Sequence, residues 1–209
     1  MPGNLLVAHR NGFVKRCQTA SAFCRKRAVQ RAALCSRMIG KTAGKASAHK
    51  KAPGQPKWAV DRGITSGTSR YTFSPDAACT RAQVVTFLWR AAGSPAPMLN
   101  KNPFTDVHTS DYYYDAVLWA VQNGITNGTS AKTFSPDATV TRAQVVTFLW
   151  RANGQPAAGN SGFVDVSSNA YYAKAVDWAF ANGITTGMDY GAFDPDTACS
   201  DCNVPLSSC

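Results

Sequence analysis

The decapeptide Thr-Arg-Ala-Gln-Val-Val-Thr-Phe-Leu-Trp occurs twice without a change, at 80–89 and at 141–150. Each copy predicts a helix whose first position is an arginine, Arg81 or Arg142. A cation there opposes the helix dipole and is disfavoured by roughly a few tenths of a kcal/mol. The placement makes sense if an anion docks at that end, where a guanidinium fork and free backbone N–H groups share one carboxylate.

The residues allow an alternative of equal weight, in which the arginines form structural salt bridges, for instance with Asp106 or Asp137. Asp106 and its counterpart Asp165 lie in two copies of a Phe-x-Asp-Val turn. Aspartate in such a turn is more often a helix or turn cap, because its carboxylate accepts hydrogen bonds from nearby backbone amides. A ligand contact and a structural role therefore both remain open for this pair.

Three further residues, Gly128, Thr129 and Ser130, form a short polar loop that either lines a groove or is a plain turn. The aromatic candidates fall into two sets. Trp150, like Trp89, ends its helix and is expected nearer the surface. The other set lies in mid-helix beside alanine and valine, where core packing is favoured over sugar stacking, and comprises Trp119 and Trp178.

Nothing in the sequence indicates catalysis, a metal or a cofactor. There is no Ser/His/Asp arrangement, no metal-ligand cluster and no phosphate-binding loop. The motif aspartates recur with the repeat, whereas a catalytic acid pair would be unique to one place. Cys199 and Cys202 have a metal-like spacing but no second pair or histidine partner, so the spacing is interpreted as accidental. Cys79 stands where the next copy has Val140, which predicts a small buried side chain.

The fold class predicted is mainly α, with tandem helix–loop–helix units. Thr141 and Gln144 predict a capping box at the start of the second helix of a unit, and Gly154 a left-handed residue after its end. Short helices are expected at 57–62, 81–92, 113–123, 142–152 and 171–182, with loops or tiny strands between them. The Phe-Ser-Pro-Asp segment at 134–137 is predicted to be extended, because the residue before proline avoids the α region.

The units divide the chain into a partial repeat 1 (58–99), a complete repeat 2 (100–159) and a partial repeat 3 (160–199). In repeat 3, Ser-Asp-Cys-Asn at 200–203 stands where Thr-Arg-Ala-Gln is expected. This pattern suggests an array truncated or frame-shifted at both ends, with an aberrant tail at 200–209. Such an array is expected to be marginally stable, and a second molecule is able to supply the missing helix in a dimer.

The charge is unevenly distributed: 13 of the 22 Lys and Arg residues and none of the 12 acids lie in 1–57. This segment is predicted to be a loosely packed or disordered tail. Binding of nucleic acid or another anionic polymer through such a tail is the less favoured alternative. No run of about 18 apolar residues predicts a membrane span, and no export signal is recognised.

The ordered motifs Phe-x-Asp-Val, Tyr-Tyr, Ala-Val-x-Trp-Ala, Asn-Gly-Ile-Thr-x-Gly, Phe-x-Pro-Asp and Thr-Arg-Ala-Gln cover about 58–198. Together they resemble the S-layer homology (SLH) repeat, although Gln83 and Gln144 stand where the family usually has glutamate. The resemblance implies three repeats in a pseudo-threefold helical arrangement. It also implies non-catalytic anchoring at the bacterial cell surface, through grooves that bind secondary cell-wall polysaccharide bearing pyruvate ketals.

On that resemblance the glycan-binding candidates are eight residues drawn from the features above: Arg81, Arg142, Asp106, Asp165, Gly128, Thr129, Ser130 and Trp150. The aspartates are then expected to accept hydrogen bonds from sugar hydroxyls, and the arginines to meet the ketal carboxylate. The expected location is the bacterial cell wall or the outside of the cell.

Overall fold

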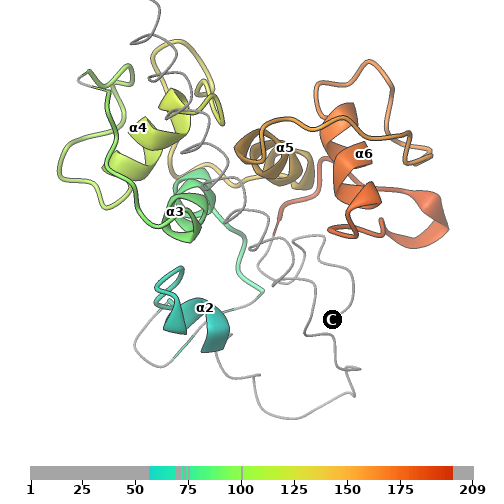
Figure 1. Ribbon diagram of the computed structural model, residues 1–209, viewed down its shortest axis with the longest axis horizontal. Helices are drawn as coiled ribbons and strands as arrows, with labels where there is room; N and C mark the ends of the chain where they lie inside the picture. The colour runs from blue at the N-terminus through green and yellow to red at the C-terminus, as the bar shows by residue number, and fades with distance from the viewer. Residues whose placement is uncertain (1–56, 69–71, 73, 75, 100, 200–209) are drawn as a thin grey trace, which may run out of the picture.

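The structure, a computed structural model, describes residues 57–68, 72, 74, 76–99 and 101–199. Within these residues the fold is helical, with isolated bridges in place of a sheet. The helices are α2 (Lys57–Asp61), α3 (Arg81–Ala91), α4 (Tyr114–Gln122), α5 (Arg142–Ala152) and α6 (Ala173–Ala181), with one 3₁₀ turn, η1 (Asp189–Gly191) (Figure 1). The predicted helices are confirmed to within two residues at either end. The basic segment at 1–56 and the tail at 200–209 lie outside the described residues.

The start of α5 is fixed by its own local sequence. Thr141 accepts a hydrogen bond from the Gln144 amide, and the Gln144 side chain accepts one from the Thr141 amide, so the predicted capping box is confirmed. The same reciprocal bonds form at α3. At the other end of α5, Gly154 has a φ of 82°, as predicted for a left-handed residue that ends a helix.

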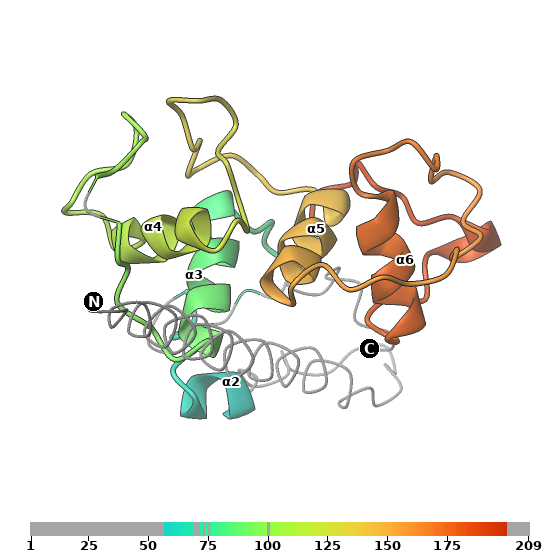
Figure 2. The same ribbon diagram turned by 45° about the horizontal axis from the view of Figure 1, so that its top comes forward.

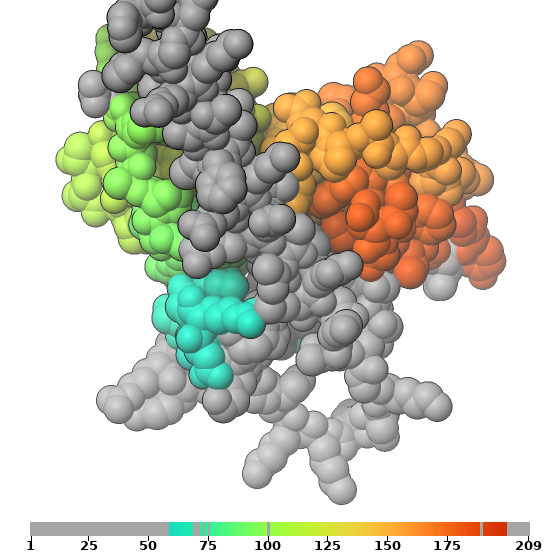
Figure 3. Space-filling view, in the orientation of Figure 1, coloured from blue at the N-terminus to red at the C-terminus, as the bar shows by residue number. Residues whose placement is uncertain are grey.

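Helices pair across the repeats. The closing helix of repeat 1, α3, packs against the opening helix of repeat 2, α4, and α5 packs in the same way against α6 of repeat 3. Figures 1 and 2 show these two pairs side by side, with α3 and α5 in contact between them. In the space-filling view the two pairs occupy opposite sides of the molecule (Figure 3). The packing unit therefore spans the boundary between two sequence repeats.

The core is built from equivalent residues of successive repeats. Phe134 and Phe193 are fully buried, as are Ile125 and Ile184. The mid-helix tryptophans Trp119 and Trp178 are buried as well, which confirms that they serve core packing. Cys79 is 5% exposed, so its prediction as a small buried side chain is also confirmed.

Three equivalent positions close a ring of backbone hydrogen bonds. The amide of Val140 donates to the carbonyl of Cys79 (3.0 Å), that of Cys199 to Val140 (2.8 Å), and that of Cys79 to Cys199 (2.9 Å). The ring brings one residue from each repeat to a common centre. A pseudo-threefold arrangement of the helices around it stays a prediction. Among the described residues, no helix has the length and apolar character needed to cross a membrane.

Candidate functional site

The start of α3 contacts repeat 2 through its backbone. The amide of Arg81 donates to the carbonyl of Ala138, and that of Ala82 to Pro136, both at 3.0 Å. The third amide, of Gln83, is bonded to the capping threonine. The expectation that free amides at this end would share a carboxylate with the arginine is therefore wrong. The next repeat supplies the acceptors that the helix terminus would otherwise lack.

The start of α5 makes the same contacts one repeat later. The amide of Arg142 donates to Thr197 and that of Ala143 to Pro195, again at 3.0 Å. We call the contact of 80–83 with 134–138 the first seam, and the contact of 141–144 with 193–197 the second seam. Each seam joins the closing helix of one repeat to a corner of the next.

The Arg81 side chain is buried in the first seam. It is 5% exposed, and its Nε donates to the carbonyl of Phe134 at 3.0 Å. The guanidinium carbon lies 5.1 Å from the ring centroid of Phe134 and 5.4 Å from that of Phe148, close enough for cation–π attraction. Burial lowers the pKa of Arg81, while Tyr171 and Asp106 oppose this effect. The arginine thus holds two repeats together beside the aspartate turn of the second.

Arg142 occupies the equivalent place in the second seam. It is 2% exposed, its Nε donates to the carbonyl of Phe193 at 3.0 Å, and its guanidinium carbon lies 4.9 Å from that ring. Burial lowers the pKa of Arg142, and the nearby Asp194 and Asp165 act to raise it. Both predicted arginines therefore lie against the neighbouring repeat, not in open solvent.

Asp106 shapes the corner that receives Arg81. Its carboxylate accepts hydrogen bonds from the amides of Phe134 (2.9 Å) and Ser135 (2.7 Å). The prediction of an extended corner is wrong at Ser135, whose φ of 57° is left-handed although Pro136 follows it. A left-handed non-glycine residue is strained and persists only where its surroundings determine it. The two amide hydrogen bonds to the Asp106 carboxylate hold Ser135 in this conformation. Asp106 therefore caps a segment that lies far along the chain.

Asp165 does the same in repeat 3, where it accepts bonds from the amides of Phe193 (2.7 Å) and Asp194 (2.6 Å). Asp194 is left-handed too, with a φ of 59°. Partial burial acts to raise the pKa of Asp165, but the amide hydrogen bonds and the charge of Arg142 outweigh it and hold that pKa below its usual value.

The loop at 128–130 is a tight turn with an exposed polar rim. A Cβ on Gly128 would lie 2.5 Å from both Cε1 of Phe104 and the carbonyl oxygen of Thr133. The exposed hydroxyl of Thr129 lies 2.7 Å from that of Ser135, and the Ser130 hydroxyl accepts a bond from the Thr133 amide. Gly128 is therefore required for packing, whereas the two hydroxyls remain at the surface.

Trp150 is half-buried at the end of α5. Its indole N–H donates to the carbonyl of Pro156 at 2.9 Å, and Trp89 makes the same bond to Pro95. The polar edge of each ring is thus used to hold the linker after its helix. The rest of the ring is partly exposed, as expected for residues nearer the surface.

Two exposed tyrosines lie beside the seams, and neither was among the site residues predicted from the sequence. Tyr112 and Tyr171 are each 61% exposed. Burial of part of the Tyr171 ring raises the pKa of its hydroxyl, Asp196 adds to this, and the charges of Arg151 and Arg81 oppose it. The signal that could have identified them is the Tyr-Tyr doublet, which recurs at a spacing of 59 beside the seam motifs.

Tyr112 is the equivalent residue of repeat 2. Burial and the charge of Asp137 raise the pKa of its hydroxyl, and the charge of Arg90 of repeat 1 opposes this rise. Each ring stands edge-to-face against the tyrosine that follows it, with centroids 5.0 Å apart.

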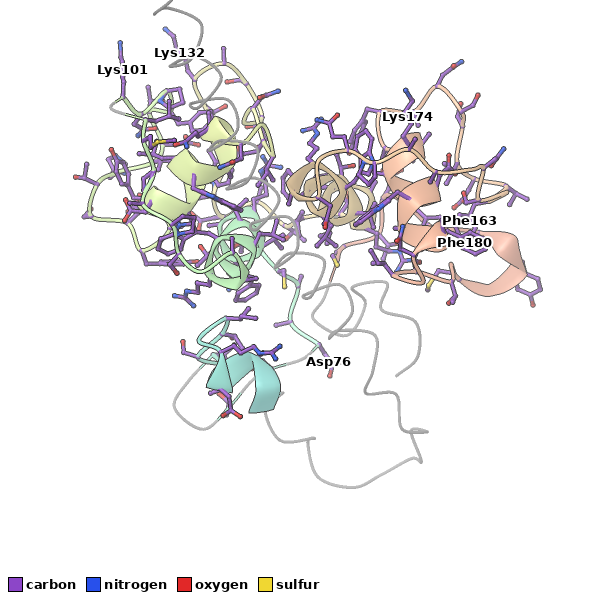
Figure 4. The ribbon with its side chains drawn as sticks, viewed as in Figure 1. Asp76, Lys101, Lys132, Phe163, Lys174 and Phe180 are labelled. Carbon is purple, nitrogen blue, oxygen red and sulfur yellow. The ribbon has the colours of Figure 1, made fainter. Side chains whose placement is uncertain are left out.

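Figure 4 shows Lys101 and Lys132 projecting from repeat 2 on one side of the molecule. In the described residues, no group of three or more His, Cys, Asp or Glu side chains is placed to hold a metal ion.

The family model of the S-layer homology domain matches residues 57–85, 103–146 and 162–200, just over half of the chain. A surface-layer 125 kDa protein of Lysinibacillus sphaericus is 33% identical over 62% of this chain and 11% of its own length. A cell surface protein of Thermoanaerobacter kivui is 35% identical over 46% of this chain and 13% of its own length. An endoglucanase of Bacillus sp. (strain KSM-635) is 36% identical over 46% of this chain and 10% of its own. The chain thus spans about a tenth of the length of these relatives. It belongs to the S-layer homology domain family.

Proposed function

We propose that this chain is a non-catalytic module that binds an acidic polysaccharide of the bacterial cell wall and so anchors to the cell surface. Family membership supports this, as do relatives named surface-layer and cell surface proteins. The endoglucanase matches over only a tenth of its length, so the likeness covers a small part of that enzyme. The finer proposal is that the polysaccharide carries pyruvate ketals, each of which presents a carboxylate.

The observation that carries the proposal is the set of groups around Tyr171 at the second seam. Tyr171 of repeat 3 is 61% exposed, and the pKa of its hydroxyl is raised by burial of part of the ring, while the charges of Arg151 of repeat 2 and Arg81 of repeat 1 oppose this. An exposed phenol offers a flat apolar face and a hydroxyl at its edge. The half-buried guanidinium of Arg151 favours a carboxylate there, whereas that of Arg81 is buried and bonded to the Phe134 carbonyl. A sugar that bears an acidic substituent matches this combination.

The eight residues predicted from the sequence divide into two roles in this proposal. Residues of the first group fix the backbone on which the groove is built: Arg81, Arg142, Asp106, Asp165 and Gly128. The second group offers exposed hydroxyls or a partly exposed ring to the polysaccharide: Thr129, Ser130 and Trp150. Lys101 and Lys132 add positive charge near the rim of repeat 2 (Figure 4). The anchoring contact is thus expected to combine stacking, hydrogen bonds and charge.

Self-association belongs to the same proposal. Because a closing helix packs against the opening helix of the following repeat, a second copy is able to supply a helix to α2. A midpoint of thermal unfolding that does not depend on protein concentration would exclude this dimer.

Retention of the full chain on purified bacterial cell-wall sacculi tests the function. We expect binding to intact sacculi and loss of binding once the secondary polysaccharide is stripped. Tyr171→Ala should weaken retention about tenfold, equivalent to about 1.4 kcal/mol. The matched variant Tyr112→Ala should have a smaller effect, because the positive charge acting on Tyr112 is that of Arg90, whereas the charges of Arg151 and Arg81 both act on Tyr171.

Two outcomes would contradict the proposal. Absence of retention on intact sacculi would remove the anchoring function. Retention that survives stripping, ignores both tyrosine substitutions and collapses steeply with salt would assign the binding to the basic residues 1–57, because phosphate-type charge contacts are strongly salt-dependent. Circular dichroism of both variants ensures that a loss of binding is not a loss of folding.

A further inference from the structure

The ring of backbone hydrogen bonds at the centre of the array holds two cysteines. Its members are Cys79, Val140 and Cys199, one from each repeat at the same position of the motif. Both cysteines are buried, at 5% and 0% exposure, and both are thiols in the structure. The valine separates them along the chain, but the Cys79 amide donates directly to the Cys199 carbonyl at 2.9 Å. The two cysteines are therefore neighbours across the contact between repeat 1 and repeat 3.

That contact differs from the two seams in its sequence. In the first and second seams, an arginine and two helix amides join one repeat to the next. The corresponding segment after repeat 3 reads Ser-Asp-Cys-Asn at 200–203, without the arginine. In the hydrogen-bond ring, the residue beside each of the two seams contacts a residue of the other type, Cys79 with Val140 and Val140 with Cys199. Between repeats 3 and 1 the two residues in contact are both cysteines, Cys199 and Cys79. The contact between repeats 3 and 1 therefore has a cysteine on both sides and lacks the arginine in its sequence.

The backbone geometry suits a covalent bond between these residues. The neighbouring contacts of the ring form antiparallel bridges, Thr80 with Thr139 and Thr141 with Ala198. Cys79 and Cys199 share one backbone hydrogen bond, and an N···O distance of 2.9 Å with ordinary bond lengths keeps their Cα atoms within about 7 Å of each other. Disulfides span Cα distances of about 4.4–6.8 Å. We propose that Cys79 and Cys199 form a disulfide that closes the array between repeat 1 and repeat 3.

Thiol–disulfide exchange with a small disulfide, such as oxidised glutathione, supplies the oxidant. The thiolate of one cysteine attacks a sulfur of that disulfide, forms a mixed disulfide and releases one thiolate. The second cysteine then attacks the protein sulfur and releases the other thiolate. Two protein thiols are oxidised to one disulfide, the reagent is reduced to two thiols, and the protons of the protein thiols pass to them. Because both side chains are buried, the exchange takes place before the core closes or during local opening.

The test uses the full chain in which the other five cysteines, Cys17, Cys24, Cys35, Cys202 and Cys209, are replaced by serine. The protein is refolded with oxidised glutathione, alkylated in denaturant and analysed by non-reducing peptide mass spectrometry. We expect a peptide pair linked through Cys79 and Cys199 in the monomer. We also expect the midpoint of thermal unfolding to fall by roughly 10 °C on reduction, because a long loop is no longer cross-linked.

Cys79→Val in the same background is the matched control, because valine is what repeat 2 has at this position. That variant should fold, and its unfolding midpoint should not change on reduction. Alkylation of both Cys79 and Cys199 after refolding with the oxidant would overturn the proposal. A cross-link that forms only between two molecules would overturn it too, as would a pair that forms without changing the unfolding midpoint. Binding to sacculi is measured separately, so failure of this proposal leaves the proposed anchoring function intact.

Discussion

The first and second seams have equivalent backbone hydrogen bonds but different side chains around them. In both, an arginine at the first position of a helix donates through Nε to a phenylalanine carbonyl at 3.0 Å, and an aspartate holds the corner that contains that phenylalanine. The surroundings are less alike. Arg81 lies close to the rings of Phe134 and Phe148, which belong to repeat 2, and Arg142 lies over the ring of Phe193 of repeat 3. The shared contacts form the framework of the array.

The loops beside the seams show the same division. In repeat 2 the hydroxyl of the exposed Thr129 lies within hydrogen-bond distance of the hydroxyls of Thr133 and Ser135. In repeat 3 the equivalent residues are Met188, Ala192 and Asp194. Both loops keep the same glycine turn, at Gly128 and Gly187. A fixed turn that carries different side chains indicates that the backbone conformation is needed for folding, whereas the side chains on the turn are able to differ.

The largest effect is expected from removing a seam arginine. Arg142→Ala should lower the free energy of unfolding by about 4 kcal/mol, because it removes packing and leaves the Phe193 carbonyl without its donor. Arg81→Ala should be at least as severe, because Arg81 contacts two rings. Arg151→Ala is the control, since this half-buried arginine donates one bond, to Ile125 at 3.2 Å, and its loss should amount to about 1 kcal/mol. Urea unfolding followed by circular dichroism measures all three.

Equal losses for Arg142→Ala and Arg151→Ala would show that the buried seam arginine is no more important than a surface one. A much larger loss for Arg142→Ala than for Arg81→Ala would reverse the order that the ring contacts predict.

Substitution of the loop glycines should have the next largest effect. Gly128→Ala adds a methyl group at 2.5 Å from the Phe104 ring and forces alanine to a φ of 83°, with an expected loss of about 3 kcal/mol. Gly187→Ala meets the Phe163 ring in the same way and tests whether the two loops are equivalent. Gly124→Ala is the matched control. Its φ is 67°, but no atom lies within 4 Å of the added group, so about 1 kcal/mol is expected from strain alone. Thermal unfolding of the three variants separates the cost of steric overlap with the ring from the cost of the left-handed backbone conformation.

The sequence predicted what depends on nearby residues. The capping box of Thr141 and Gln144 and the left-handed Gly154 are decided within one helix and its flanks, and both are confirmed. Ser135 was predicted wrongly because the preference of a residue before proline was outweighed by a carboxylate from Asp106, which is 29 positions earlier. A rule that considers only neighbours has no access to that contact.

The same limit explains the error at the helix termini. The amides of Arg81 and Ala82 look unoccupied in the sequence, because their acceptors belong to the next repeat. The structure shows the two arginines bonded to carbonyls across a seam, and the two aspartates bonded to backbone amides of their own repeat. Tyr171 could have been found, since the tyrosine doublet recurs with the repeat, yet its exposure becomes evident only once the helices are packed.

The smallest and most specific effect is a pH dependence at the second seam. The folded-state pKa of Asp165 is lowered, because the amide hydrogen bonds and Arg142 outweigh the opposing effect of burial. Its carboxylate therefore stabilises the fold above the unfolded pKa of about 3.9, and this contribution is lost as the pH falls through the lower folded pKa. The unfolding midpoint of the wild type should drop between about pH 4 and pH 2, and part of that drop should be absent in Asp165→Asn, which starts from a lower midpoint at pH 7.

Asp106→Asn at neutral pH completes the comparison between the seams. Asp106 accepts the same pair of amides, so its replacement should lower the midpoint at pH 7 by an amount similar to that of Asp165→Asn. If Asp165→Asn retains the full acid-induced drop of the wild type, the carboxylate does not hold the corner in the way its two short bonds suggest. The left-handed conformation of Asp194 would then be maintained by the proline and the packing of Phe193 alone.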